Sequence, residues 1–193
     1  GVEVNSGRMN LGVVTVNLPR IALESEGDLN KFWEIFNERM NIAEDALVYR
    51  VERTKEATPA NAPILYQYGA FGRRLGKEES VDLLFKNRRA TISLGYIGLY
   101  EVATVFFGNH WENNPEAKEF TLDIIRDMKR RVEEWSDQYG YHFSIYSTPS
   151  ESLTDRFCRL DTEKFGSLPD ITDKEYYTNS FHYDVRKNPT PFE

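Results

Sequence analysis

Three hydroxyl side chains lie close together in the sequence, at Ser147, Thr148 and Ser150. The residues before them, 142–146, alternate in character and carry aromatic side chains, which is typical of a strand. A helical pattern follows, so the hydroxyls lie at a predicted strand-to-helix junction. The first turn of a helix has backbone N–H groups without partners at the positive end of its peptide dipoles. Together, these groups predict a phosphate-binding turn.

The same junction also has a purely structural interpretation. Thr148 suits the N-cap position, Pro149 the first helical position and Glu151 the third, which together form a capping box. Capping boxes are common, and Glu151 would repel an anion unless it folded back onto the cap. The residues alone therefore leave two alternatives, a capped helix or a phosphate site. The apolar stripe expected to pack this helix is Leu153, Phe157, Leu160 and Phe165, with Gly166 as the stop.

A second strand-to-helix junction comes earlier in the chain. Residues 90–94 are typical of a buried strand, residues 95–98 of a glycine-containing turn, and residues 99–107 of a helix that ends before Gly108. Ligands of α/β folds bind at the carboxyl ends of strands, so this junction is a second candidate site. Its glycines could equally serve close packing. The chain has no dinucleotide fingerprint and no P-loop sequence.

Other kinds of chemistry have little support. The three histidines do not have metal-ligand spacing, and there is no second cysteine to complete a zinc site. Cys158 falls within the predicted helix after the hydroxyls, where a buried, unreactive thiol is expected rather than a nucleophile. No nucleophile elbow is present, so a hydrolase triad is not supported.

The elements that would position these residues alternate between strands and helices. An apolar, β-branched run over residues 13–18, ended by Pro19, predicts a strand covered on both faces. Two long amphipathic helices are expected, one capped by Asp28 and one capped by Asn114 and ended by Gly140. Their apolar stripes are Leu29, Phe32, Phe36, Met40, Ala43, Leu47 and Val51 in the first, and Ala117, Phe120, Ile124, Met128, Val132, Trp135 and Tyr139 in the second. This order favours an α/β fold.

Weaker patterns predict further segments. They are a linker at 58–63, an extended segment at 64–68, a loop at 69–74, a short helix at 80–85 and an extended tail at 176–183. The basic run over residues 129–131 has acids around it and predicts a solvated helix face.

The bulk properties restrict the possible partners. The chain has 193 residues and a net charge of -7, which disfavours nonspecific binding to nucleic acid or to an acidic membrane. A single cysteine and the absence of a signal-like or membrane-spanning apolar run predict a cytoplasmic protein. The non-methionine start and the abrupt end predict one partial domain, over residues 1–193, cut from a longer protein.

Seven sequence motifs occur together and in a specific order. They cover residues 7–14, 17–22, 62–66, 93–98, 146–151, 155–161 and 177–182. In this combination the chain closely resembles the catalytic subunit of the anaerobic (class III) ribonucleoside-triphosphate reductases, over essentially its whole length.

The resemblance implies both a fold and a reaction. The family fold is a ten-stranded α/β barrel, of which this chain resembles a middle-to-late portion. The family converts ribonucleoside triphosphates to deoxyribonucleoside triphosphates. It uses a glycyl radical, made with S-adenosylmethionine by an iron–sulfur activase, and a thiyl radical on a finger-loop cysteine. Formate as reductant, a zinc in the C-terminal region, Mg-ATP and deoxynucleotide effectors, and a homodimer are also implied for the parent protein.

Fewer residue roles carry over to this chain. Asn10 resembles an active-site asparagine that faces the ribose hydroxyls, where its amide could donate and accept hydrogen bonds. Ser147, Thr148 and Ser150 resemble the substrate-phosphate loop, and Gly95 and Tyr96 resemble a pocket wall. The thiyl cysteine, the radical glycine and the zinc ligands are expected outside the chain.

Two functions follow as alternatives. The first is a part of a reductase barrel that is inactive by itself, since the radical groups are expected elsewhere. The alternative is a non-catalytic module on the same scaffold that binds a nucleotide or a protein partner.

Overall fold

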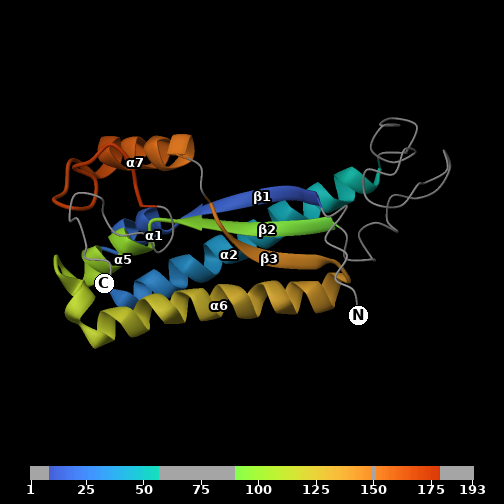
Figure 1. The fold of residues 1–193 in the computed structure, drawn as a ribbon, viewed down its shortest axis with the longest axis horizontal. Coiled ribbons are helices and arrows are strands. Elements are labelled where there is room, and N and C mark those ends of the chain that lie inside the picture. The colour runs from blue at the N-terminus through green and yellow to red at the C-terminus, as the bar shows by residue number, and fades with distance from the viewer. Residues whose placement is uncertain (1–8, 57–89, 149–150, 179–193) are drawn as a thin grey trace. The chain divides into compact units, whose positions relative to one another are not determined.

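The computed structural model describes residues 9–56, 90–148 and 151–178 (Figure 1). Its elements are β1 (Met9–Asn17), α1 (Leu18–Glu24), α2 (Leu29–Lys55), β2 (Ala90–Ile97), α5 (Leu99–Phe107), the 3-10 helix η1 (Trp111–Asn113), α6 (Pro115–Tyr139), β3 (His142–Ser147) and α7 (Glu151–Phe165). The segments predicted at 58–63, 64–68, 69–74 and 80–85 lie outside the described residues, as do residues 179–183 of the predicted tail.

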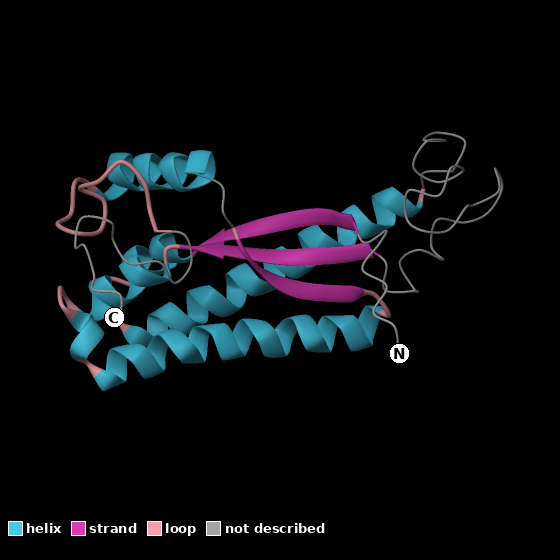
Figure 2. Cartoon of the chain, viewed as in Figure 1, coloured by secondary structure: helices cyan, strands magenta, loops and turns pink. Residues whose placement is uncertain are grey.

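The three strands form one parallel sheet in the order β1-β2-β3 (Figure 2). Helices α1 and α2 precede β2, and helices α5 and α6 precede β3. Parallel neighbours need such helical crossovers, because a tight hairpin can join only antiparallel strands. The predicted α/β class is confirmed.

The two strands expected to be covered on both faces differ in burial. Every residue of β2 except Thr91 is buried, as predicted. In β1 only Val16 is buried among the residues whose side chains are described, while Val13 and Val14 are partly exposed. The prediction for β1 is therefore wrong within this structure. The sheet order supplies the reason, because β1 is an edge strand among the residues that the structure describes and has a neighbouring strand there on one side only.

Helix α1 is an element that the sequence analysis missed. The Asn17 side chain caps it, with Oδ1 accepting a hydrogen bond from the Arg20 backbone N–H at 3.2 Å. Pro19 lies in the first turn, where its fixed φ suits a helix and its missing N–H has no consequence. Pro19 thus begins a helix, and Leu18 belongs to that helix rather than to the strand.

Helix α2 matches its predicted cap and most of its predicted stripe. Asp28 Oδ1 accepts hydrogen bonds from the backbone N–H groups of Asn30 and Lys31, at 2.8 and 3.2 Å. All predicted stripe residues are buried except Leu29, which is 42% exposed. Leu29 lies in the first helical turn, so fewer neighbours cover it.

Helix α6 also matches the sequence pattern. Asn114 Oδ1 accepts a hydrogen bond from the Glu116 backbone N–H at 3.0 Å, and Gly140 follows the helix with φ 73°. The predicted stripe from Ala117 to Trp135 is buried. Tyr139 is partly exposed, and its hydroxyl donates to Glu44 at 2.7 Å, which raises the pKa of Tyr139 to about 12.

The described residues gather into two compact units. Residues 9–14, 42–56, 90–94 and 129–145 belong to the first unit, and residues 15–41, 95–128, 146–148 and 151–178 belong to the second. In the first, Trp135 of α6 packs edge-on against Phe143 of β3, with ring centroids 6.0 Å apart. The second contains an aromatic cluster built by α2, α5 and α6. Its members are Phe32, Trp33, Phe36, Phe106 and Phe120.

Helix α7 turns a different face inward from the one that the sequence predicts. Leu160, a member of the expected apolar stripe, is 38% exposed, whereas Thr154, Cys158 and Asp161 are buried. These three recur at helical spacing and form a largely polar inner face. The expected stripe is wrong as the fully buried face, because donors from Asn17, Arg20 and Tyr177 hold Asp161 inward; Phe157 of that stripe still packs against the buried cluster of Ile97, Cys158 and Tyr177. Within the part of the chain that the structure describes, no helix is long and apolar enough to cross a membrane.

Candidate functional site

The predicted phosphate residues lie at the carboxyl end of β3. Ser147 is exposed at the end of the strand, and Thr148 is buried directly after it. The Thr148 backbone N–H donates to the Tyr96 carbonyl at 3.4 Å, and its Oγ1 lies 3.1 Å from Oγ1 of Thr15. Thr148 therefore makes hydrogen bonds to both β1 and β2, which fix the start of the turn.

The structure describes only part of the predicted turn and helix start. Pro149 and Ser150 lie outside the described residues, and so does the side chain of Glu151. Helix α7 is described from Glu151 and ends at Phe165, with Gly166 at φ 84° as its predicted stop. The capping box and the phosphate role of Ser150 therefore stay predictions.

The predicted pocket-wall residues lie beside Thr148. Gly95 and Tyr96 are buried within β2, which continues to Ile97 instead of ending at residue 94. Burial raises the pKa of the Tyr96 hydroxyl above its ordinary value. The Tyr96 carbonyl accepts the Thr148 N–H, so the structure brings these two predicted residues together.

The chain's own residues cover the turn after β2. Gly98 has φ 73°, and a Cβ added there would lie 2.2 Å from Cγ of Pro19. The Gly98 N–H donates to the carbonyl of Thr178 at 2.9 Å. The glycine is thus needed for a left-handed backbone and for close packing, which was one of the two alternatives from the sequence.

Asn10 belongs to the first unit, whereas the phosphate and pocket-wall residues belong to the second. It is the second residue of β1 and is exposed. Its Oδ1 accepts a hydrogen bond from the Gly12 N–H at 3.3 Å. Its predicted role toward the ribose hydroxyls stays a prediction.

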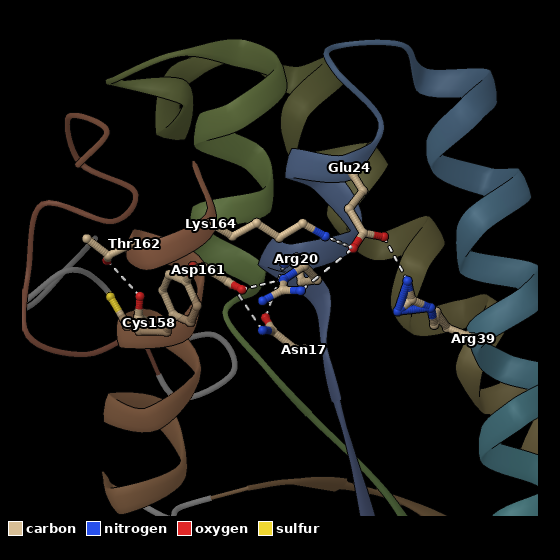
Figure 3. A network of polar contacts seen from close by, with 9 residues as sticks. Asn17, Arg20, Glu24, Arg39, Cys158, Asp161, Thr162 and Lys164 are labelled. Carbon is tan, nitrogen blue, oxygen red and sulfur yellow. Dashed lines mark hydrogen bonds and ion pairs between the residues drawn. The ribbon is translucent and has the colours of Figure 1, made fainter. Parts of the chain in front are cut away.

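A buried carboxylate that the sequence patterns did not reveal lies on α7 and faces Asn17 and Arg20 (Figure 3). Asp161 of α7 has 0% exposure and accepts three hydrogen bonds. Its Oδ1 accepts from Nε of Arg20, and its Oδ2 accepts from Asn17 Nδ2 at 3.0 Å and from the Tyr177 hydroxyl at 2.7 Å. The pKa of Tyr177 is raised well above its ordinary range, mainly by burial and secondly by the hydrogen bond to Asp161. We name these four residues the carboxylate network.

Glu24 of α1, beside the carboxylate network, forms ion pairs with three basic side chains (Figure 3). Its carboxylate lies 3.8 Å from Arg20 Nη1, 2.7 Å from Arg39 Nη2 and 3.3 Å from Lys164 Nζ. Since Lys164 belongs to α7, Glu24 ties α7 to α1 a second time.

A second buried carboxylate holds the segment that follows α7. Glu101 of α5 has 0% exposure and accepts hydrogen bonds from the Thr178 N–H and hydroxyl, at 2.8 and 2.7 Å. Lys174 Nζ lies 2.6 Å from the same carboxylate and supplies the balancing charge. The buried Glu101 carboxylate thus has both a balancing charge and hydrogen-bond donors, as a buried ion pair requires.

Cys158 is buried, as predicted. Its thiol donates to the Lys174 carbonyl at 3.2 Å, and burial raises the pKa of the thiol to about 11. A thiol in this environment stays protonated near neutral pH and is a poor nucleophile. Among the residues that the structure describes, no group of three or more metal-ligating side chains could hold a metal ion.

An open depression of about 680 Å³ lies along α7 and the segment after it. Its charged lining residues are Asp155, Arg159, Glu163, Asp173, Lys174 and Glu175. Acids outnumber bases, and Lys174 is already paired with Glu101. The depression therefore does not favour a phosphate.

Comparisons with known proteins agree with the motifs of the chain. The sequence profile of the family described as "Anaerobic ribonucleoside-triphosphate reductase" matches residues 2–193. The anaerobic ribonucleoside-triphosphate reductase of Salmonella typhimurium is 48% identical over 194 residues, which cover 100% of this chain and 27% of the relative. The enzyme of the same name from Enterobacteria phage T4 is 47% identical over 197 residues, covering 100% of this chain and 31% of its own length.

Solved structures share the fold. The anaerobic ribonucleotide reductase from Thermotoga maritima, in complex with dATP and CTP, gives a TM-score of 0.68 at 27% identity over 90% of this chain and 29% of its own. The same enzyme with MES in its active site also gives a TM-score of 0.68. This chain spans 27 to 31% of the length of the curated relatives above. On these matches, the chain belongs to the anaerobic ribonucleoside-triphosphate reductase family.

Proposed function

We propose that this chain is part of the ten-stranded catalytic barrel of an anaerobic ribonucleotide reductase. The parent protein would convert ribonucleoside triphosphates to deoxyribonucleoside triphosphates by glycyl and thiyl radical chemistry, in the cytoplasm. The observation that carries the proposal is identity of 47–48% to named reductases over the whole chain. The parallel sheet, with one fully covered strand, supports a place in a barrel wall.

The radical groups of the parent protein are proposed to lie outside this chain. Cys158 is not proposed for the thiyl role, because its thiol is fully buried, where it cannot contact a substrate, and donates to the Lys174 carbonyl. The activase partner, formate, zinc, the nucleotide effectors and the homodimer are likewise proposed for the parent. The isolated chain should form no deoxynucleotide. Deoxynucleotide formation by the purified 193-residue chain would contradict this assignment.

The proposed contribution of this chain is to hold the substrate. Ser147, Thr148 and Ser150 would form the turn that receives the substrate phosphates, beside Gly95 and Tyr96. The hydrogen bonds of Thr148 to Thr15 of β1 and to Tyr96 of β2 support this, because a residue that is already held in place loses little freedom on binding. Thr148 would position the turn, while the exposed Ser147 would offer its hydroxyl.

Substitution of Ser147 in the complete reductase tests this assignment. A hydrogen bond to a charged group contributes about 1.5–3 kcal/mol, so Ser147→Ala should raise KM for the ribonucleoside triphosphate about tenfold. Ser150→Ala should act in the same direction. Ser167→Ala is the matched control, since Ser167 is exposed beyond the end of α7. Unchanged KM in folded Ser147→Ala and Ser150→Ala variants would favour a scaffold with another ligand or partner.

Asn10 is proposed to face the ribose hydroxyls. Asn10→Ala should lower kcat with little effect on stability, because the exposed side chain makes only a local hydrogen bond to Gly12 among its described contacts. Full turnover by this variant would remove Asn10 from the active site.

A further inference from the structure

The carboxylate network fixes α7 at a defined place. Asp161 receives donors from three separate parts of the chain: Asn17 at the end of β1, Arg20 in α1 and Tyr177 in the segment after α7. A buried carboxylate without donors is costly, so α7 is stable only where all three donors reach it. The network therefore selects one position of the helix.

Two separate sets of hydrogen bonds hold the α7 region to residues 15–20, at the end of β1 and the start of α1. Just before α7, Thr148 contacts Thr15 through their hydroxyls at 3.1 Å. Asp161 lies ten residues after Glu151, or about 15 Å along the helix axis at 1.5 Å per residue, and bonds to Asn17 and Arg20. Two separated attachments restrict rotation as well as translation, which a single attachment would not do.

The same network reaches the turn after β2. Tyr177 bonds to Asp161 through its hydroxyl and to the Thr154 carbonyl through its N–H, at 3.4 Å. The next residue, Thr178, accepts the hydrogen bond from Gly98. Asp161 thus connects α7 with the end of β1 directly, and with the end of β2 through Tyr177 and Thr178.

We propose that Asp161 is a positioning residue for substrate binding. It holds α7 so that Ser147, Thr148 and the first helical N–H groups meet the phosphates of the ribonucleoside triphosphate. This inference rests on the proposed phosphate role of the turn. Asp161 itself touches no substrate, because it is fully buried.

Asp161→Asn in the complete reductase tests the inference. The amide keeps the side-chain shape, but its NH₂ group must face either Arg20 or the pair formed by Asn17 and Tyr177, all of which are donors. Misplacement by about 1 Å can change rates by up to ~100-fold. We expect KM for the ribonucleoside triphosphate to rise at least about tenfold, with a smaller fall in kcat at saturating substrate. Asp155→Asn, on the exposed side of α7, should leave both constants unchanged.

The division between KM and kcat distinguishes positioning from a merely structural role. A purely structural loss would lower the amount of active enzyme, and so kcat, at constant KM. Constant KM in folded Asp161→Asn would overturn the inference. If that variant fails to fold, Tyr177→Phe tests the positioning role instead, because it removes one hydroxyl and keeps the ring. We expect a rise in KM of about threefold in Tyr177→Phe, and an unchanged KM there would also overturn the inference.

Ser147→Ala, measured in parallel, separates this inference from the proposed function. A raised KM in Ser147→Ala together with an unchanged KM in Asp161→Asn contradicts the positioning role alone. Unchanged KM in both variants contradicts the phosphate turn itself. A raised KM in both supports the two proposals together.

Discussion

The second unit holds its helices by two contrasting means. The aromatic cluster joins α2, α5 and α6 through rings whose centroids lie 5.3 to 5.9 Å apart, without a directional bond. The carboxylate network joins α7 to β1, to α1 and to the segment after α7 through three hydrogen bonds to one buried carboxylate, one from each. The first depends on volume and apolar area, while the second depends on charge and on the direction of each donor.

This contrast teaches how each region should respond to substitution. Dispersion and apolar burial are sums of many small contributions, so a change of shape at nearly constant volume has a small cost. A buried polar set is stable only when each member is satisfied, so even an isosteric change leaves groups unpaired. The network should therefore be less tolerant of conservative change than the cluster.

The largest effects are expected from truncation in either region. Phe32→Ala should lower the free energy of unfolding by about 3–5 kcal/mol, because Phe32 is fully buried among four rings. Asp161→Ala should have a cost of about 3–5 kcal/mol, because Arg20 and Tyr177 lose their common partner. Urea unfolding measures both. A loss below ~1 kcal/mol in either would contradict its assigned place in the core.

Gly98, at the β2–α5 junction, tests how much close packing of the backbone contributes to stability. Gly98→Ala should be destabilising by about 3 kcal/mol, since its φ is 73° and its Cβ would meet Pro19 at 2.2 Å. Gly166→Ala is the matched control, with φ 84° and no atom within 4 Å of the added Cβ. It should have a cost of only about 1–2 kcal/mol. Equal losses would mean that the packing against Pro19 has no role.

Conservative substitutions test the contrast directly. Phe32→Leu should have a cost below about 1.5 kcal/mol, because neighbouring rings can shift to fill the space. Asp161→Asn should have a cost of about 2 kcal/mol or more, since one amide hydrogen must face a donor. The urea midpoints of the two variants, each compared with wild type, measure these costs. A cost for Asp161→Asn below that for Phe32→Leu would break the comparison.

An effect that is absent at neutral pH is a pH dependence that arises from Cys158. Its pKa is raised from 9.0 to about 11, mainly by burial, so the unfolded state loses this proton first as pH rises. The unfolded state then binds fewer protons, and stability falls between pH 9 and about 11. Below pH 9 both states are protonated and the thiol has no effect.

Comparison of wild type with Cys158→Ala isolates this contribution. The difference in unfolding free energy between the two should be constant below pH 9 and should shift against the wild type toward pH 11. Tyr139 contributes equally in both proteins, and Tyr177 stays protonated in both folded proteins over this range, because burial and Asp161 raise its pKa well above its ordinary value. A pH-independent difference would mean that the thiol is not desolvated.

Local signals predicted most of the described elements. Asp28 and Asn114 mark helix starts because their side chains accept from nearby backbone N–H groups, which depends on a few adjacent residues. The long apolar stripes gave the inner faces of α2 and α6. Helix α1 was missed because Pro19 suits both the end of a strand and the first turn of a helix.

The carboxylate network could not be predicted from local patterns. An aspartate on a helix normally indicates a solvated face, and Asp161 is buried only because donors up to 144 residues away in sequence reach it. The exposed edge of β1 likewise depends on the order of strands, which periodicity does not reveal. The motif over residues 155–161 contained Asp161, but a motif alone assigns it no partner.

Equilibrium binding to the complete reductase tests the central claim most directly. The affinity of the ribonucleoside triphosphate and of the corresponding nucleoside would be measured for wild type and Ser147→Ala. The account predicts that Ser147→Ala weakens triphosphate binding about tenfold and leaves nucleoside binding unchanged, because only the phosphates meet the turn. Equal triphosphate affinity in the two proteins, or an equal loss for both ligands, would contradict it.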